Sequence, residues 1–305
     1  MIISVILITL ISIIFPGIIS KTKAKIVGRK GPKVLQVFYD NIRLIKKGSV
    51  YSNTTSYIFQ IAPIIYFSTI LLATLFIPFG NYKALLSFDG DFVLFAYLLA
   101  LGKFFMIIAA MDTGSSFEGM GANREAYYSL LVEPAFFIII ASVALLTNNT
   151  SFFDLFNSMH LDTELSYLIT ILAIYVFLWI AMVENSRLPV DDPKTHLELT
   201  MVHEVMVLDY SGFDLALIQL ANGLKFSIYG ALIFNFILPV QFSLLYQVLI
   251  FISIEIVFAL VVGLLESFRA RNKMMKNPQW IISLSAIAVI AFFSVLIISG
   301  KLILI

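Results

Sequence analysis

The sequence predicts an all-α, multi-pass membrane protein with about eight transmembrane helices. Three observations support this, of which composition is the first. Of the 305 residues, 60% are hydrophobic and 13% are charged, whereas soluble globular chains are about 45–50% apolar and about 25% charged. Polar residues are too few to cover a water-soluble body, and the hydrophobicity is too high for disorder. No repeat or low-complexity linker divides the chain, so we expect residues 1–305 to form a single integral membrane domain.

The second observation is a series of apolar segments long enough to cross a bilayer, which takes about 20 residues. These segments are residues 1–20, 57–79, 92–111, 129–147, 166–183, 213–238, 243–266 and 279–304. The first has no basic region before it and no small-residue cleavage site, so we expect a retained anchor rather than a signal peptide. Pro63 and Pro239 fall within or beside spans, where kinks are tolerated.

The third observation is the placement of lysine and arginine, which indicates the orientation. The loop after the first span carries Lys21, Lys23, Lys25, Arg29, Lys30, Lys33, Arg43, Lys46 and Lys47, with Asp40 as its one acid. The loops at 112–128, 184–212 and 267–278 add Arg124, Arg187, Lys194, Arg269, Arg271, Lys273 and Lys276. The opposite loops and the tail hold only Lys83 and Lys301. Because basic residues collect on the cytoplasmic side, we expect both termini to be non-cytoplasmic and the functional loops to be cytoplasmic.

The same composition excludes several kinds of chemistry. The chain has no cysteine, which rules out disulfides, a cysteine nucleophile and thiolate ligation of zinc or Fe–S clusters. It has three histidines and a net charge of about +1. We therefore expect no catalytic residue, metal or resident cofactor in this chain, and no nucleic-acid partner. Any electrons would travel through other subunits.

Four charged residues fall well inside predicted spans, away from the span ends: Lys103, Glu133, Lys225 and Glu255. Each would cost at least about 2.5–3.5 kcal/mol at the centre of a membrane helix, so such residues are rare and usually paired or functional. The functional interpretation is a hydrated path that relays protons or cations. The alternative is a set of buried ion pairs that only fixes the helix register.

The 184–212 loop has the most specific local pattern. Asp192 before Pro193 is typical of a helix start, and this helix is expected to run to about Leu208. Its apolar stripe would be Leu197, Met201, Val205 and Leu208. His203-Glu204 begins like a zinc-protease motif but lacks the second histidine four residues later, so a metal site is not predicted. The glycines at 114–121 follow no strand, which argues against a phosphate-binding loop.

Several motifs resemble a known family. Gly28-Arg29-Lys30-Gly31-Pro32, with Asp40 and Lys46, resembles the first cytoplasmic loop of the respiratory complex I membrane subunit next to the peripheral arm. Residues 112–117, 121–125 and 131–134 resemble its hydrogenase branch, the anchor subunits of formate hydrogenlyase and other energy-converting nickel–iron hydrogenases. Arg187-Leu188-Pro189-Val190-Asp191, Glu198-Leu199 and Tyr210-Ser211-Gly212 are similar to the family signature between the fifth and sixth helices.

The resemblance implies an anchor and coupling subunit in the cell inner membrane, with hydrogenase-like large and small subunits, antiporter-like subunits and lipid as partners. Those subunits would hold the nickel–iron centre and the Fe–S clusters. Five acids fall on or close to acidic positions of the family and would form the entry of a proton or ion path: Glu133, Glu184, Asp191, Glu198 and Glu204. We expect the charged residues inside spans, Lys103, Lys225 and Glu255, to continue this path. The residues implied in arm docking or ion pairing are Arg29, Lys30, Asp40, Arg124 and Arg187.

The chain also departs from the complex I pattern, which leaves other functions open. Val190 replaces a phenylalanine, and the segment from Arg187 to Tyr210 is a few residues longer and contains His196 and His203. Quinone binding is therefore left open as an alternative, in which the chain forms part of a quinone cavity. A self-contained secondary transporter is a second alternative, although paired broken helices are not found. A purely structural anchor is the third.

Overall fold

The computed structural model describes residues 2–159, 164–192, 201–238 and 242–299, and within these ranges it is helical without a strand. Eight helices are long and apolar enough to cross a membrane, which confirms the prediction of an all-α multi-pass protein. They are α1 (Ile2–Ile26), α3 (Tyr57–Ala73), α4 (Asp91–Asp112), α5 (Ser116–Thr147), α7 (Glu164–Glu184), α9 (Gly212–Ile237), α10 (Leu244–Phe268) and α11 (Asn277–Ile298). The shorter elements are α2 (Gln36–Ile45), α6 (Phe152–Ser158), α8 (His203–Met206) and the 3-10 turns η1 (Thr74–Phe76) and η2 (Met274–Lys276).

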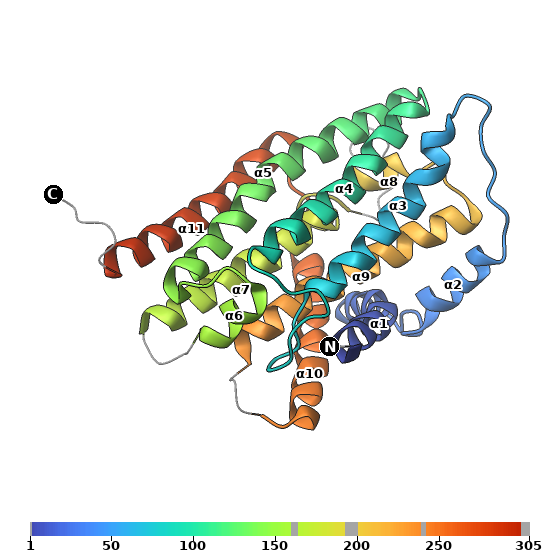
Figure 1. Ribbon diagram of the computed structural model, residues 1–305. Helices are drawn as coiled ribbons and strands as arrows, with labels where there is room; N and C mark the ends of the chain where they lie inside the picture. Colours follow the sequence, from blue (N-terminus) through green and yellow to red (C-terminus); the bar gives the residue numbers. More distant parts are fainter. Residues whose placement is uncertain (1, 160–163, 193–200, 239–241, 300–305) are drawn as a thin grey trace.

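Helix α9 forms the centre of the bundle. In its most apolar window 83% of the residues are buried, against 28–61% in the other spans. It packs against α1, α3, α7 and α10, and Figure 1 shows it enclosed between the α3–α4 side and the α1–α10 side. Glycine allows close approach here, because a Cβ at Gly223 would lie 2.8 Å from the Ser12 carbonyl of α1. The residues of α9 from Gly223 to Phe236 are all buried, so a side chain in this stretch is shielded from lipid by the neighbouring helices.

The connections at one end of the bundle lie against one another, and we call residues 27–56, 113–115, 185–192, 201–211 and 269–276 the basic end. The Val50 amide donates to Ser211, the Ser56 amide to Asp112, and the Asn272 amide to the Pro189 carbonyl. Most lysines and arginines outside the described helices belong to this end. The lysines and arginines that the sequence concentrates in alternate loops therefore lie together at one end of the bundle.

Helix α5 begins well before the predicted span 129–147, so the prediction of a loop over 112–128 is wrong for residues 116–128. These first turns are too polar to be predicted as a membrane span, yet they pack inward. The bare Cα of Gly121 faces Val205 and Met206, and Glu118 is 1% exposed. Of the glycines at 114–121, Gly121 therefore serves helix packing, whereas a Cβ at Gly114 or Gly119 would meet nothing within 4 Å.

The predicted helix from Asp192 to about Leu208 is also wrong in its described part, because Met201 and Val202 are not helical and α8 has only four residues. The carboxylate of Asp191 accepts hydrogen bonds from the Val202 and His203 amides, at 3.0 and 3.2 Å, and so starts the helix late. Met201 and Val205 are buried as expected, but Leu208 is 51% exposed. Residues 193–200, with Pro193, His196, Leu197 and Glu198, lie outside the described residues, as does Pro239.

The first loop folds back on α1. Gly28 and Gly31 have φ of +74° and +66°, a left-handed conformation that glycine adopts without a Cβ penalty. The chain then returns so that the Val34 backbone contacts Gly17, and the amphipathic α2 follows. The Gly28–Pro32 motif is therefore a reversal of the chain direction at the basic end.

Candidate functional site

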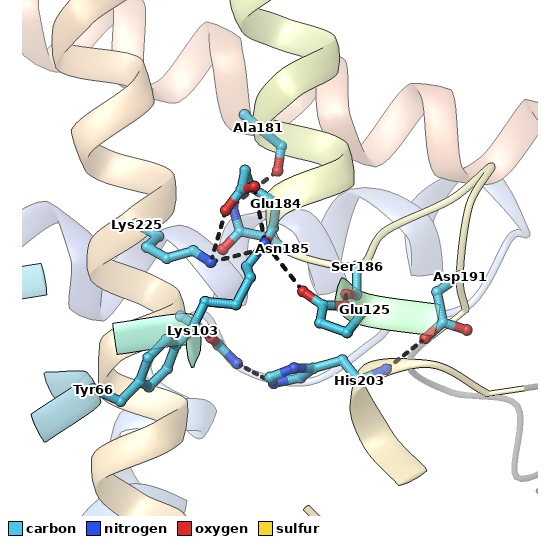
Figure 2. Close-up of polar contacts among 11 residues, drawn as sticks. Tyr66, Lys103, Glu125, Ala181, Glu184, Asn185, Ser186, Asp191, His203 and Lys225 are labelled. Carbon is cyan, nitrogen blue, oxygen red and sulfur yellow. Dashed lines mark hydrogen bonds and ion pairs between the residues drawn. The ribbon is translucent and has the colours of Figure 1, made fainter. Parts of the chain in front are cut away.

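Four charged side chains from four helices meet inside the bundle, and we call them the central cluster (Figure 2). Lys103 Nζ of α4 lies 2.8 Å from Glu184 of α7 and 3.1 Å from Glu125 of α5. Lys225 Nζ of α9 lies 3.4 Å from the other Glu184 oxygen. Lys225, Glu125 and Lys103 are only 2%, 4% and 7% exposed. Two ammonium and two carboxylate groups compensate each other, which offsets much of the cost of burying charge.

The end of α7 helps to hold this cluster. Lys225 Nζ donates to the Glu184 backbone carbonyl at 2.7 Å, a group left without an intrahelical partner where the helix stops. The negative end of the α7 dipole also favours an ammonium there. The chain then turns through Ser186, whose φ is +47°, and its hydroxyl donates to Glu125 at 3.1 Å. One helix terminus thus orients both acids and one base.

A chain of polar contacts leads from the central cluster to the basic end. The Tyr66 hydroxyl donates to Asn222 Oδ1 at 2.6 Å, and Asn222 Nδ2 lies 3.1 Å from His203 Nε2. Lys225 Nζ sits 5.6 Å from the centre of the Tyr66 ring. Since the amide nitrogen can only donate, His203 accepts at Nε2 and carries its proton on Nδ1. Burial lowers the pKa of His203 to about 4, with Glu125 opposing the shift, so the imidazole is neutral at pH 7.

This depressed pKa predicts a pH-dependent stability. The unfolded imidazole takes up a proton near pH 6.5 and the folded one only near pH 4, so stability should fall as the pH drops through this window. We expect His203→Gln to flatten the fall in Tm between pH 6.5 and pH 4, measured by thermal unfolding in detergent. An unchanged slope in His203→Gln would contradict the neutral assignment.

A cavity of about 720 Å³ opens beside His203 at the basic end. Its walls come from α1, α2, α9 and the connection after α7, and the predicted residues Asp40, Arg187 and Glu204 line it. Asp40 also accepts from Gln36 at 2.9 Å. Because His203 stands on the wall and contacts Asn222, the cavity is linked through hydrogen bonds to Tyr66 next to the cluster.

A smaller cavity of about 50 Å³ approaches the cluster from the side. It lies among α4, α5, α7 and α9, and Lys103, Glu184 and Glu133 line it together with Tyr229. Glu133 is exposed on the outer surface of α5, in the middle of a membrane helix. Because it lines the same cavity as Lys103 and Glu184, Glu133 lies between the outer surface of the bundle and the central cluster.

Asp191 organises the connection that frames the larger cavity. Its carboxylate is fully buried, lies 2.8 Å from Arg271 and accepts the Asp192, Val202 and His203 amides. Burial raises the pKa of Asp191, while Arg271 and these amides offset part of that shift. Asp191 thus ties the basic end together, and through His203 it touches the polar chain to the cluster.

The remaining predicted residues lie apart from the cluster. Glu255 of α10 is fully buried, accepts from Ser227 at 3.2 Å and rests against Gly230, and no ion pair joins it to the cluster among the described residues. Arg124 donates to the Met201 carbonyl at 2.9 Å. Arg29 and Lys30 are exposed at the basic end.

Another predicted residue, Arg187, is used in an ion pair. Its guanidinium lies 3.3 Å from Glu266, which also pairs with Lys23 at 2.7 Å.

Sequence reasoning did not include five residues in the site: Glu125, Tyr66, Asn222, His203 and Arg271. Glu125 stood in a recognised motif, so only its position in a supposed loop concealed it. In the described part of the chain, no three His, Asp or Glu side chains gather as metal ligands.

Comparison with known proteins places this geometry in a family. The family model described as NADH dehydrogenase matches residues 1–299. The chain belongs to the NADH dehydrogenase family. It is 30% identical to hydrogenase-4 component C of Escherichia coli over 226 residues, covering 74% of this chain and 70% of that protein. It is 28% identical to formate hydrogenlyase subunit 4 of the same organism, covering 92% of each chain.

The chain is also similar to a subunit of a complex I-type enzyme and to a chain of a solved structure. A subunit of the NADH-quinone oxidoreductase of Wolbachia pipientis is 26% identical over 92% of this chain and 91% of that protein. A chain in the structure of the membrane-bound sulfane sulfur reductase, an archaeal respiratory membrane complex, aligns with a TM-score of 0.80. It is 20% identical and covers 96% of this chain and 97% of its own, which shows the shared fold. The relatives confirm the predicted resemblance to hydrogenase, formate hydrogenlyase and complex I subunits.

Proposed function

We propose that this chain is the integral membrane anchor and coupling subunit of a multisubunit, redox-driven, ion-translocating complex of the hydrogenase or formate hydrogenlyase type. The observation that carries the proposal is the central cluster, which combines buried acids and bases with polar approaches from two directions. The names of the relatives, which are components of hydrogenase-4 and formate hydrogenlyase, support the same assignment. The chain itself makes or breaks no bond in the redox reaction.

The proposed path begins in the large cavity at the basic end and ends at Glu133, on the outer surface of α5. A proton enters the large cavity and crosses beside His203, Asn222 and Tyr66, the polar side chains between this cavity and the Lys225–Glu184–Lys103 pairs. The amide of Asn222 orients its neighbours by hydrogen bonds and is not itself protonated. The proton then leaves toward Glu133 and a neighbouring membrane subunit. The ammonium groups of Lys103 and Lys225 exchange protons and repel Na⁺, so the central cluster favours proton over sodium translocation. Asp191, Glu204 and the undescribed Glu198 would belong to the entry, and Glu255 would be a separate buried acid on α10.

The proposed partners follow from the two faces of this path. The hydrogenase-like large and small subunits, which would hold the nickel–iron centre and Fe–S clusters, would dock at the basic end through Arg29 and Lys30. Antiporter-like subunits would cover Glu133. In this proposal the basic end is cytoplasmic, both termini are on the other side, and the complex sits in the cell inner membrane. Redox turnover would shift the 185–211 connection, and with it the field at the cluster.

A second candidate function is a quinone-linked subunit of the complex I type. The observation that favours it is the cavity of about 720 Å³, which has apolar side chains such as Phe226 beside its charged walls. Ligand pockets of about 300–1,000 Å³ commonly combine apolar walls with a few polar groups. Saturable binding of a short-chain quinone to the purified chain, lost on Phe226→Trp, would favour this candidate over the first.

The decisive experiment for the proposed function is Glu133→Gln in the complete complex. We expect assembly and the redox centres to remain, because Glu133 is exposed in the isolated chain and has no ion pair among the described residues. Proton uptake into reconstituted vesicles, followed with a pH-sensitive dye, should fall by at least about tenfold relative to turnover. The control is Glu164→Gln, an exposed acid at the other end of the bundle. Normal coupling in Glu133→Gln would overturn the proposed exit.

A further inference from the structure

A groove of about 340 Å³ runs along the outer face of α1 near its C-terminal end. Ile18 and Ile26 of α1 and Leu260 of α10 give it apolar walls, and Lys21 and Lys25 lie along the same wall. Ile18, Lys21 and Lys25 follow each other at three- and four-residue spacings, which puts them on one helix face. The groove is separate from the large cavity and from the central cluster.

Three segments build this groove. Helices α1 and α10 approach closely at Gly263, where a Cβ would lie 2.9 Å from the Thr22 Cβ. The returning first loop supplies the third wall, since Val34 lines the groove and its backbone contacts Gly17. The groove is therefore formed by the packing of the chain itself and does not depend on one side-chain rotamer.

The charges at the groove are not compensated by protein. Lys21 and Lys25 are exposed, and neither has an acidic partner within 4 Å in the part of the chain that the structure describes. Lys23, between them in sequence, points to the other side and pairs with Glu266 at 2.7 Å. Two ammonium groups therefore lie next to an apolar groove at the end of a membrane helix. This combination fits a ligand that has both an anionic group and a hydrocarbon chain.

We propose that this groove is a binding site for one anionic phospholipid. The phosphate lies between Lys21 and Lys25, and an acyl chain packs on Ile18, Ile26 and Leu260. Each lysine near a membrane surface favours an anionic lipid by roughly fivefold, so the pair gives a preference of at least about tenfold over a zwitterionic lipid. The inference does not depend on the redox partners or on the proposed proton path.

The test is native mass spectrometry of the full chain in mild detergent, titrated with phosphatidylglycerol and with phosphatidylcholine of the same acyl chains. We expect one tightly held phosphatidylglycerol and at least about a tenfold weaker binding of phosphatidylcholine. Lys21→Gln with Lys25→Gln should abolish the preference. The matched control is Lys273→Gln with Lys276→Gln, which removes the same charge from the same end of the bundle and should keep it.

Two further measurements keep the result decisive. Leu260→Trp fills the apolar wall and should weaken both lipids while both lysines remain, which covers the case in which the double lysine variant is unstable. An excess of inorganic phosphate should not displace the lipid, because it offers no acyl chain. A wild-type chain without lipid preference would overturn the proposal. Equal loss in the control variant, or displacement by phosphate, would do so as well.

Discussion

Glu184→Gln should abolish ion translocation and strongly destabilise the protein. Glu184 is the residue shared by both lysines of the central cluster, at 2.8 Å from Lys103 and 3.4 Å from Lys225. A glutamine at this position would keep the shape but leave the cluster with an excess positive charge. Removing one partner of a buried ion pair costs about 3–5 kcal/mol, because the other charge stays buried without compensation. Thermal unfolding in detergent and proton uptake into vesicles measure the two effects.

The matched variant separates charge balance from proton transfer. Glu184→Gln combined with Lys225→Met again has one ammonium, Lys103, facing one carboxylate, Glu125. We expect this double variant to regain most of the lost stability, since its buried charges are balanced, but to translocate no ions. Wild-type translocation in either variant would remove the cluster from the path. Equal Tm values in the wild type and Glu184→Gln would show that the pairs add nothing to stability.

The sequence predicts the spans well because bilayer crossing depends on a local property, a stretch of about 20 apolar residues. All eight predicted segments overlap helices of the structure. The start of helix α5 is harder to predict because residues 116–128 are polar and gain their burial from α8, a contact far away in sequence. The bounds of the short α8 escape prediction for a similar reason, since Asp191, in the preceding connection, sets where this helix begins.

The central cluster was only partly predictable. Its bases stand out, because Lys103 and Lys225 interrupt apolar spans. Glu125 does not, since it belongs to a polar stretch that the hydropathy of the sequence assigns to a loop. Pairing depends on how helices α4, α5, α7 and α9 face each other, and no local pattern encodes that. The same limit explains Glu255, a buried acid in a span that packs against Gly230 without joining the cluster.

The Asp191 carboxylate accepts three backbone amides of the described part of the connection between α7 and α9 and pairs with Arg271, so Asp191→Asn should loosen the basic end. The asparagine side chain keeps one acceptor oxygen but loses the negative charge. That charge pairs with Arg271 at 2.8 Å and strengthens the hydrogen bonds that the carboxylate accepts from the Val202 and His203 amides. Charge-assisted hydrogen bonds contribute about 1.5–3 kcal/mol each, roughly twice the neutral ones. We expect these two amides to exchange hydrogen at least about tenfold faster, and the connection to become sensitive to protease.

Arg271→Gln tests which part of the Asp191 contacts matters most. It removes the ion pair but leaves the carboxylate and the amides it holds, so exchange at Val202 and His203 should rise far less than in Asp191→Asn. Asp209→Asn is the control, since it changes an exposed acid of the same connection. If the redox arm docks on this surface, Asp191→Asn should also release it from the complex during purification. Protected Val202 and His203 amides in Asp191→Asn would contradict the role of the carboxylate, because these backbone groups would then be held by other contacts.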